Sequence, residues 1–134
     1  MYHVTGMDFT NAGRASTGIK DTLKRIGMHP AVVRRVAVAA YEAEMNVIIH
    51  ARRGDLWLRV TPNSVVVDVE DEGPGIPDIG LAMQEGYSTA SRELREMGFG
   101  AGMGLPNIKR QADVFEINSD VGRGTRLHIV VNQA

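Results

Sequence analysis

The stretch YEAEMNVIIH, residues 41–50, carries a polar stripe through a segment that is otherwise apolar. In a helix, Glu42 and Asn46 are four positions apart and project from the same face, and His50 extends the stripe by one more turn. One interpretation is a helix edge whose polar groups, His50 included, find hydrogen-bond partners within the protein. The alternative is a functional pair, because an amide oxygen is a hard ligand for Mg²⁺ and a carboxylate can accept a proton from an attacking hydroxyl.

The periodicity on both sides of this stretch predicts an α+β fold. Apolar residues at helical spacing predict helices at Ala15–Ile26, Pro30–Arg53, Pro77–Glu85 and Leu105–Ala112. Alternating or β-rich runs predict strands at Tyr2–Phe9, Leu56–Thr61, Ser64–Val69, Val114–Asn118 and Arg126–Val131. Residues 86–98 have no steady period and are typical of a functional loop. This order predicts one domain, residues 1–134, built as a two-layer sandwich in which helices cover one face of a mixed, mostly antiparallel sheet.

The composition excludes several classes of function. Across 134 residues, 15 Lys and Arg balance 16 Asp and Glu, which removes the electrostatic case for binding nucleic acid or an anionic membrane. The chain has no Cys, so a disulfide framework, a thiol nucleophile and a thiolate metal site are all excluded. No apolar run reaches the roughly 18 residues of a membrane span, and the first residues lack the hydrophobic stretch of a signal peptide. We therefore expect a cytoplasmic protein.

A second candidate feature, DEGPG at residues 71–75, directly follows a predicted strand. Two glycines around a proline at the exit of a strand would let the backbone approach a ligand closely while Asp71 faces inward. A plain tight turn is the alternative. Residues 68–72 contain four carboxylates, those of Asp68, Glu70, Asp71 and Glu72. Alternation along the strand is expected to turn some of them outward.

A third candidate feature is GFGAGMGL at residues 98–105, just before a predicted helix. Alternate glycines free the backbone N–H groups to converge on an anion, and the helix adds the positive end of its dipole. The spacing is not the dinucleotide fingerprint G-x-G-x-x-G, and the chain contains no Gly-Lys-Ser or Gly-Lys-Thr of a P-loop. A flexible connector is the alternative, but four alternating glycines beside a helix favour a phosphate site.

Together these features resemble the motifs of the GHKL, or Bergerat-fold, ATPases. Residues 42–50 (E-x-x-x-N-x-x-x-H) resemble the N-box of that family, residues 71–75 (D-x-G-x-G) its first glycine box, and residues 98–105 its second. Residues 122–125, GRGT, are similar to its closing Gly-Thr element and precede a predicted strand. The four elements occur in the family's order between residues 30 and 132, and the resemblance implies the Bergerat ATPase fold.

The resemblance implies a role in binding ATP and Mg²⁺ for each matched residue. Asn46 would hold the Mg²⁺ that bridges the phosphates, and Glu42 would orient or deprotonate the protein serine that attacks. Asp71 would accept a hydrogen bond from the exocyclic amine of adenine, with support from Thr125. The remaining contacts to the nucleotide would come from Gly73, Gly75, Gly98, Gly100, Gly102, Gly104 and Leu105.

Within this superfamily, residues 81–89 and 103–110 most resemble the bacterial anti-sigma-factor and partner-switching serine kinases. The implied function is an ATP- and Mg²⁺-dependent serine/threonine protein kinase that phosphorylates a STAS-type antagonist protein and so controls a sigma factor or a regulatory phosphatase. One alternative is an anti-sigma factor that acts mainly as a nucleotide-gated binding module, and another is an ATP-binding domain without transfer activity. Residues 79–99 would form a lid over the nucleotide, and the family also implies a homodimer.

Overall fold

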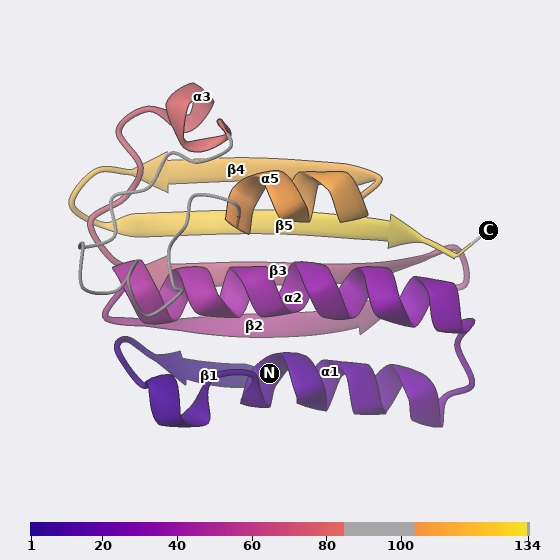
Figure 1. Ribbon diagram of the computed structural model, residues 1–134. Helices are drawn as coiled ribbons and strands as arrows, with labels where there is room; N and C mark the ends of the chain where they lie inside the picture. Colours follow the sequence, from indigo (N-terminus) through magenta and orange to yellow (C-terminus); the bar gives the residue numbers. More distant parts are fainter. Residues whose placement is uncertain (85–103, 134) are drawn as a thin grey trace.

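The computed structural model describes residues 1–84 and 104–133 (Figure 1). Its strands are β1 (Tyr2–Thr5), β2 (Arg53–Val60), β3 (Ser64–Glu72), β4 (Val114–Asp120) and β5 (Gly124–Asn132). Its helices are α1 (Arg14–Arg25), α2 (Pro30–His50), α3 (Ile79–Ala82) and α5 (Gly104–Gln111), with a 3₁₀ turn η1 at Phe9–Asn11. The loop predicted for residues 86–98 lies outside the described residues.

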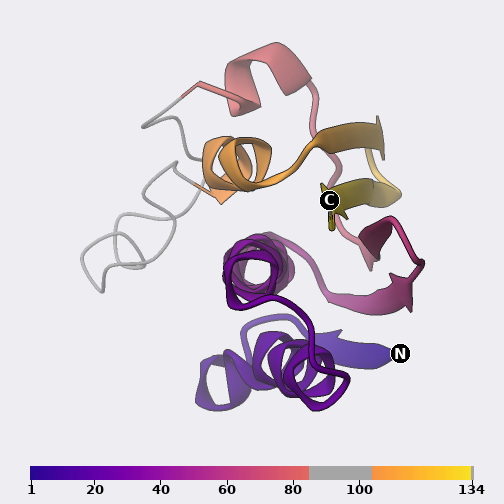
Figure 2. The same ribbon diagram turned by 90° about the vertical axis from the view of Figure 1, so that its right-hand side faces the viewer.

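The five strands form one sheet in the order β1-β2-β3-β5-β4. All four neighbouring pairs are antiparallel. Helices α1, α2 and α5 lie against one face of this sheet, and within the described ranges no helix covers the opposite face (Figure 1, Figure 2). The structure thus confirms the predicted α+β sandwich with one helical layer.

Helix α2 ends at His50, three residues earlier than the periodicity predicts. Ala51 takes an extended conformation, with φ −104° and ψ 166°, and Arg53 already pairs with both neighbouring strands. The turn after β1 also fastens this end of the helix, because the Met7 N–H donates to the Ile48 carbonyl at 2.7 Å. Local propensity alone would extend α2 to Arg53, but strand pairing at Arg53 ends the helix earlier.

Strand β3 continues three residues beyond its predicted end, through the acidic run. Its alternation turns Asp68, Glu70 and Glu72 toward the uncovered face of the sheet. Each of these carboxylates pairs with a basic residue of a neighbouring strand: Asp68 with His128 at 2.5 Å, Glu70 with Arg126 at 2.8 Å and Glu72 with Arg53 at 2.9 Å. Arg126 and Arg53 place positive charges opposite Glu70 and Glu72, which offsets part of the repulsion between the carboxylates.

Other element boundaries also differ from the sequence-based prediction. Strand β1 ends at Thr5 rather than Phe9, because the chain turns at Gly6 and Met7 adopts a left-handed φ of 61°. Helix α3 is a single turn within the longer segment predicted to be helical. Strand β5 begins two residues early, at Gly124, because it pairs with β4 up to the turn.

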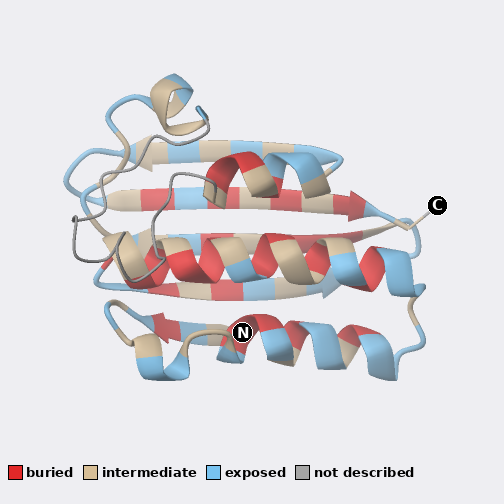
Figure 3. Cartoon of the chain, viewed as in Figure 1, coloured by how far each residue is buried: buried red, intermediate tan, exposed pale blue. Residues whose placement is uncertain are grey.

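The core lies between the sheet and helices α1, α2 and α5 (Figure 3). Its most deeply buried side chains come from every layer and include Ile19, Leu23, Val36, Ile48, Leu56, Val67, Ile108 and Ile129. Burying one large aliphatic side chain contributes about 1.5–3 kcal/mol, so these contacts fix α2 firmly against the sheet. Among the described helices, none combines the length and the apolar character needed to cross a membrane.

One charged side chain lies inside this core. Glu44 of α2 is 2% exposed, and its carboxylate accepts hydrogen bonds from the backbone N–H groups of Gly13, Ala15 and Ser16 at 3.0–3.2 Å. The first N–H groups of a helix have no partner within that helix, and a negative charge there also interacts favourably with the helix dipole. Glu44 therefore fastens the start of α1 to the middle of α2.

Candidate functional site

The described candidate residues come together at one edge of the sheet, at the left of Figure 1, where α2 and β3 end and β5 and α5 begin. The loop after β3 lies directly against the β4–β5 turn. The Gly122 N–H donates to the Pro74 carbonyl at 2.8 Å, and the Gly73 N–H donates to the Arg123 carbonyl at 3.2 Å. Segments that are far apart in the sequence thus form one continuous edge.

Asp71, near the end of β3, is half-buried at this edge. Its Oδ1 accepts a hydrogen bond from the Thr125 backbone N–H at 3.1 Å. Burial raises the pKa of the Asp71 carboxyl, and the bond from Thr125 opposes that shift. A carboxylate has about four acceptor positions, so the bond to Thr125 leaves capacity for a ligand N–H. The structure therefore brings together the two residues that the resemblance assigns to base recognition.

The glycines around Asp71 are needed for contacts within the protein. A Cβ on Gly75, whose φ is +77°, would lie 2.4 Å from the Asp120 carbonyl oxygen. A Cβ on Gly124 would lie 1.9 Å from the Asp71 carbonyl oxygen, and one on Gly73 would lie 3.1 Å from a backbone atom of the residue that follows α2. These close approaches build the edge on which the Asp71 side chain sits.

Ser119 is a residue of this edge that the sequence analysis does not single out. Its hydroxyl accepts from the Ile76 N–H at 2.7 Å, bonds with Thr125 Oγ1 at 2.9 Å and donates to the Gly124 carbonyl at 3.2 Å. One hydroxyl therefore joins the loop after β3 to the β4–β5 turn. The sequence of β4 does contain a signal for this residue. The two preceding positions that face the helices are apolar, whereas the next position on that face holds the polar Ser119.

Glu42 lies at the other end of the site, beside the start of α5. Asn107 Nδ2 donates to Glu42 Oε1 at 3.4 Å, and a Cβ on Gly104 would lie 3.4 Å from Glu42 Oε2. Asn46 is half-buried one turn further along the same face of α2, and His50 lies one turn beyond it. Burial lowers the pKa of His50, which favours the neutral imidazole.

The second glycine cluster is described only at its end. Gly104 opens α5, so the first turn of this helix and the positive end of its dipole lie beside Glu42. The Leu105 side chain is buried in the core, so any contact that this residue makes with a ligand would come from its backbone. The positions predicted at Gly98, Gly100 and Gly102 lie outside the described residues.

Among residues 1–84 and 104–133, no three His, Asp or Glu side chains converge as a metal-binding group. Mg²⁺ is usually held by only one or two protein ligands, together with substrate phosphates and several waters. The amide of Asn46 fits this mode of binding, because it is a single oxygen donor on the face of α2 that also carries Glu42.

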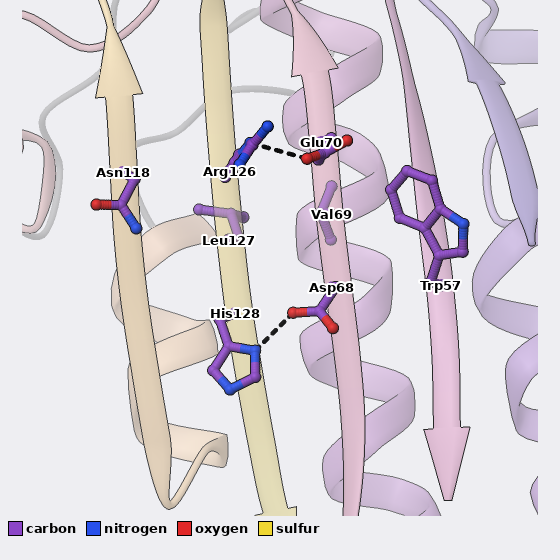
Figure 4. Close-up of a pocket in the computed structure, with 8 residues that line it drawn as sticks. All are labelled: Trp57, Asp68, Val69, Glu70, Asn118, Arg126, Leu127 and His128. Carbon is purple, nitrogen blue, oxygen red and sulfur yellow. Dashed lines mark hydrogen bonds and ion pairs between the residues drawn. The ribbon is translucent and has the colours of Figure 1, made fainter.

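A separate open hollow of about 410 Å³ lies on the uncovered face of the sheet (Figure 4). Trp57 borders it, and two contacts cross it: the ion pair of Glu70 with Arg126 and a hydrogen bond between Asp68 and His128. The sheet itself separates this hollow from α2 and Glu42, and Arg126 already pairs with Glu70 there. We therefore assign the candidate site to the edge of the sheet and not to the hollow.

Comparisons with known proteins agree with the fold. Residues 8–131 match the family model of the histidine kinase-like ATPase domain. The chain is 30% identical over 115 residues to the serine/threonine-protein kinase RsbT of Bacillus subtilis (strain 168), an alignment that covers 83% of this chain and 80% of the relative. It is 36% identical over 95 residues to the anti-sigma F factor of Caldanaerobacter subterraneus subsp. tengcongensis, covering 67% of this chain and 63% of that relative.

A solved structure of the mycobacterial sensor histidine kinase MprB has a similar fold, with a TM-score of 0.57 over 98% of this chain and 96% of that one. At 16% identity, this likeness concerns the fold alone. The sequence predicts a serine/threonine kinase, and the relative RsbT is named as a kinase of this kind, which confirms the prediction. On the family match over residues 8–131, this chain belongs to the family of histidine kinase-like ATPase domains.

Proposed function

We propose that this protein is an ATP- and Mg²⁺-dependent serine/threonine kinase of a cytoplasmic partner-switching module. Its proposed substrate is a STAS-type antagonist that controls a sigma factor or a regulatory phosphatase. The observation that carries the proposal is the position of Glu42, a carboxylate that lies against the first turn of α5 and shares a helix face with Asn46. The similarity to RsbT, a named serine/threonine kinase, supports it further.

Asp71 would recognise the adenine base. A half-buried carboxylate accepts a hydrogen bond strongly, because the low local dielectric strengthens electrostatic interactions. The Thr125 N–H holds one oxygen of Asp71, and Ser119 holds Thr125 in turn. The acceptor would therefore be in place before the ligand arrives.

Asn46 and the start of α5 would hold the triphosphate end. The Asn46 amide oxygen would bind Mg²⁺, and the first N–H groups of α5 would face the phosphate oxygens. Bound ATP with Mg²⁺ supplies the transferable phosphoryl group and neutralises charge on it. Gly98, Gly100 and Gly102 complete the proposed phosphate cradle by resemblance.

Glu42 would accept the proton of the incoming serine hydroxyl. The serine oxygen forms a bond to the γ-phosphorus, the bond from that phosphorus to the β–γ bridging oxygen breaks, and ADP leaves with the electron pair. Phosphoryl transfer of this kind depends more on positioning and charge stabilisation than on covalent catalysis by the protein. The residues around Glu42 therefore matter through the position that they give its carboxylate.

A second candidate function is a nucleotide-gated binding module. The 36% identity to an anti-sigma F factor favours it. In that case the bound nucleotide would decide which partner the protein retains, and phosphorylation would reset the complex. Retention of different partners with ADP and with ATP in a pull-down would support this module, and identical retention would count against it.

The kinase proposal is tested by incubating the purified protein with γ-labelled ATP, Mg²⁺ and candidate STAS-domain proteins. We expect label on one serine of one partner, identified by mass spectrometry, and no transfer when the metal is chelated. A partner with that serine changed to alanine is the matched control. ATP binding without transfer to any STAS partner would count against the kinase and leave the nucleotide-gated binding module or an ATP-binding domain without transfer activity.

A further inference from the structure

Asn107 and Arg110, one turn apart on α5, form a chain of side chains that ends on Glu42. Arg110 Nη1 donates to Asn107 Oδ1 at 2.5 Å, and Asn107 Nδ2 donates to Glu42 Oε1 at 3.4 Å. The family resemblance assigns a role to neither residue of α5. The chain nevertheless connects the exposed side of α5 to the carboxylate proposed as the base.

The order of donors and acceptors in this chain is fixed by chemistry. An amide has an accepting oxygen and a donating nitrogen, whereas a guanidinium only donates and a carboxylate only accepts. With Arg110 on one side and Glu42 on the other, one orientation of the Asn107 amide satisfies both neighbours. The reversed amide would place donor against donor and acceptor against acceptor.

The contact with Asn107 gives the two oxygens of Glu42 different surroundings. Oε1 accepts from Asn107, whereas Oε2 faces Gly104 at the start of α5. Gly104 has no side chain, so it does not cover that oxygen. One oxygen is thus held by the protein, and the other faces the end of α5 where the phosphates would bind.

The packing of α5 on α2 has its own support at the far end of α5. Arg35 of α2 donates to the Gln111 carbonyl from Nε at 2.9 Å and from Nη2 at 2.6 Å, and Nη2 lies 3.2 Å from Asp113 Oδ2. Ile108 adds a fully buried side chain between these elements. The Asn107 contact is therefore not required to dock α5, and the orientation of Glu42 is its distinguishing consequence.

We infer that Asn107, oriented by Arg110, is a positioning residue that holds Glu42 in the rotamer needed to accept the proton of the serine. The inference rests on the proposed kinase function. A general base works within about 2.6–3.2 Å of the hydroxyl that it deprotonates, and hydrogen bonds at such sites are often longer before substrate binds. A misplacement of about 1 Å can lower a rate by about 100-fold.

Asn107→Asp and Asn107→Ala test this inference in the full-length protein. We expect both to lower kcat for phosphoryl transfer by about 10-fold, with the Kd for ADP and the KM for ATP within about twofold of wild type. Asn107→Asp adds a second carboxylate beside Glu42, so it should also move the acid limb of the pH–rate profile to higher pH. Asn107→Ala should leave that limb in place.

The role of Arg110 is tested with a matched pair of charge changes on α5. Arg110→Gln should lower kcat several-fold, and Arg110→Lys should recover part of the loss. Lys109→Gln removes the same charge from the adjacent exposed position and should keep the wild-type rate. Equal effects of Arg110→Gln and Lys109→Gln would overturn the assignment of Arg110.

The contact itself is measured without nucleotide by ¹⁵N NMR. The side-chain NH₂ signals of Asn107 should shift as carboxylates become protonated at low pH, and this titration should disappear in Glu42→Gln. If both Asn107 variants keep the wild-type rate and pH profile while Glu42→Gln has lost transfer, the positioning role is wrong and the kinase proposal stands. If Glu42→Gln transfers at the wild-type rate, the roles assigned to Glu42 and Asn107 are both wrong, and the kinase activity itself stands.

Discussion

The two ends of the candidate site are built differently. At the Asp71 end, backbone groups make most of the contacts: Asp71 accepts from the Thr125 N–H at 3.1 Å, and the Ser119 hydroxyl makes three bonds of 2.7–3.2 Å. At the Glu42 end, the carboxylate is held by a side chain, Asn107, at 3.4 Å. Recognising a base requires an acceptor fixed in advance, whereas the hydrogen bonds of a general base are often long before substrate binds and tighten in the complex. The site is therefore rigid where it would select its ligand and adjustable where it would act.

The largest expected effect is at the adjustable end. Glu42→Gln keeps the shape of the side chain but removes the proton acceptor, so we expect the rate of phosphoryl transfer to fall by about 100-fold or more. The Kd for ADP should stay within about twofold of wild type, measured by calorimetry. Glu116→Gln changes an exposed carboxylate on the uncovered face and should alter neither quantity. A similar loss of ADP affinity in Glu42→Gln would remove the functional contrast between the two ends.

Asp71→Asn tests the rigid end. The Asn oxygen can keep the bond from Thr125, but the new NH₂ group would face the donor of the ligand. We expect the affinity for ADP to fall about 10- to 100-fold, the loss of a hydrogen bond to a charged group, with little change in the transfer rate at saturating ATP. Calorimetry and single-turnover kinetics measure the two quantities separately. A lower rate at saturation with normal affinity would contradict the assignment of Asp71 to recognition.

Asp71→Asn should also change the stability of the ligand-free protein in a pH-dependent way. Because burial raises the pKa of Asp71 above its unfolded value of about 4, the folded state binds the proton more tightly and loses stability as pH rises through this range. At pH 7 the free energy of unfolding should therefore be higher for Asp71→Asn than for wild type. Below pH 4 the difference should shrink, as urea unfolding at pH 7 and pH 3 would measure. Equal stability at pH 7 would show that ionised Asp71 does not oppose folding.

A smaller effect is expected from Ser119→Ala. This change leaves the Ile76 N–H without its partner and should lower the free energy of unfolding by about 1–3 kcal/mol. It should also weaken ADP binding several-fold, because Thr125 loses its bond to Ser119. Ser64→Ala removes a hydroxyl contact of 2.9 Å at the far end of the sheet and should affect stability alone. Normal ADP affinity in Ser119→Ala would mean that this rigidity does not serve binding.

The smallest effect is expected on the uncovered face of the sheet. Glu70→Gln breaks the 2.8 Å ion pair with Arg126. The Glu70 side chain is 47% exposed and the Arg126 side chain is 73% exposed. Exposed pairs of this kind contribute little, so the free energy of unfolding should change by less than about 0.5 kcal/mol. ADP affinity and transfer rate should be unchanged. A clear loss of either would show that this face is coupled to the site.

The features that the sequence predicts well are those determined by neighbouring residues. The stripe of Glu42 and Asn46 follows from helical spacing, and the hairpin of β2 and β3 follows from two β-rich runs around a turn. The need for glycine at Gly75 is also visible in the sequence. What the sequence does not reveal is that the Asp120 carbonyl, from a distant turn, is the group that approaches Gly75.

The features that the sequence does not predict depend on partners far along the chain. Strand β3 extends through Glu70 and Glu72, and Arg126 and Arg53 of the neighbouring strands lie opposite these two carboxylates. Asn107 and Ser119 are ordinary polar residues in the sequence, and they gain their importance from contacts 65 and 43 positions away. Local propensity carries no information about such contacts.

The position of β5 in the sheet has a consequence for synthesis on the ribosome. This strand follows the other four in the sequence, yet it lies between β3 and β4 and pairs Asn132 with Ser64. The hairpin of β2 and β3 therefore emerges with one long edge unpaired until β5 is translated. Thr125 arrives on that same strand, so the Asp71 acceptor is completed in the step that closes the sheet. A nascent chain therefore forms the hydrogen bond between Thr125 and Asp71 only when β5 pairs with β3.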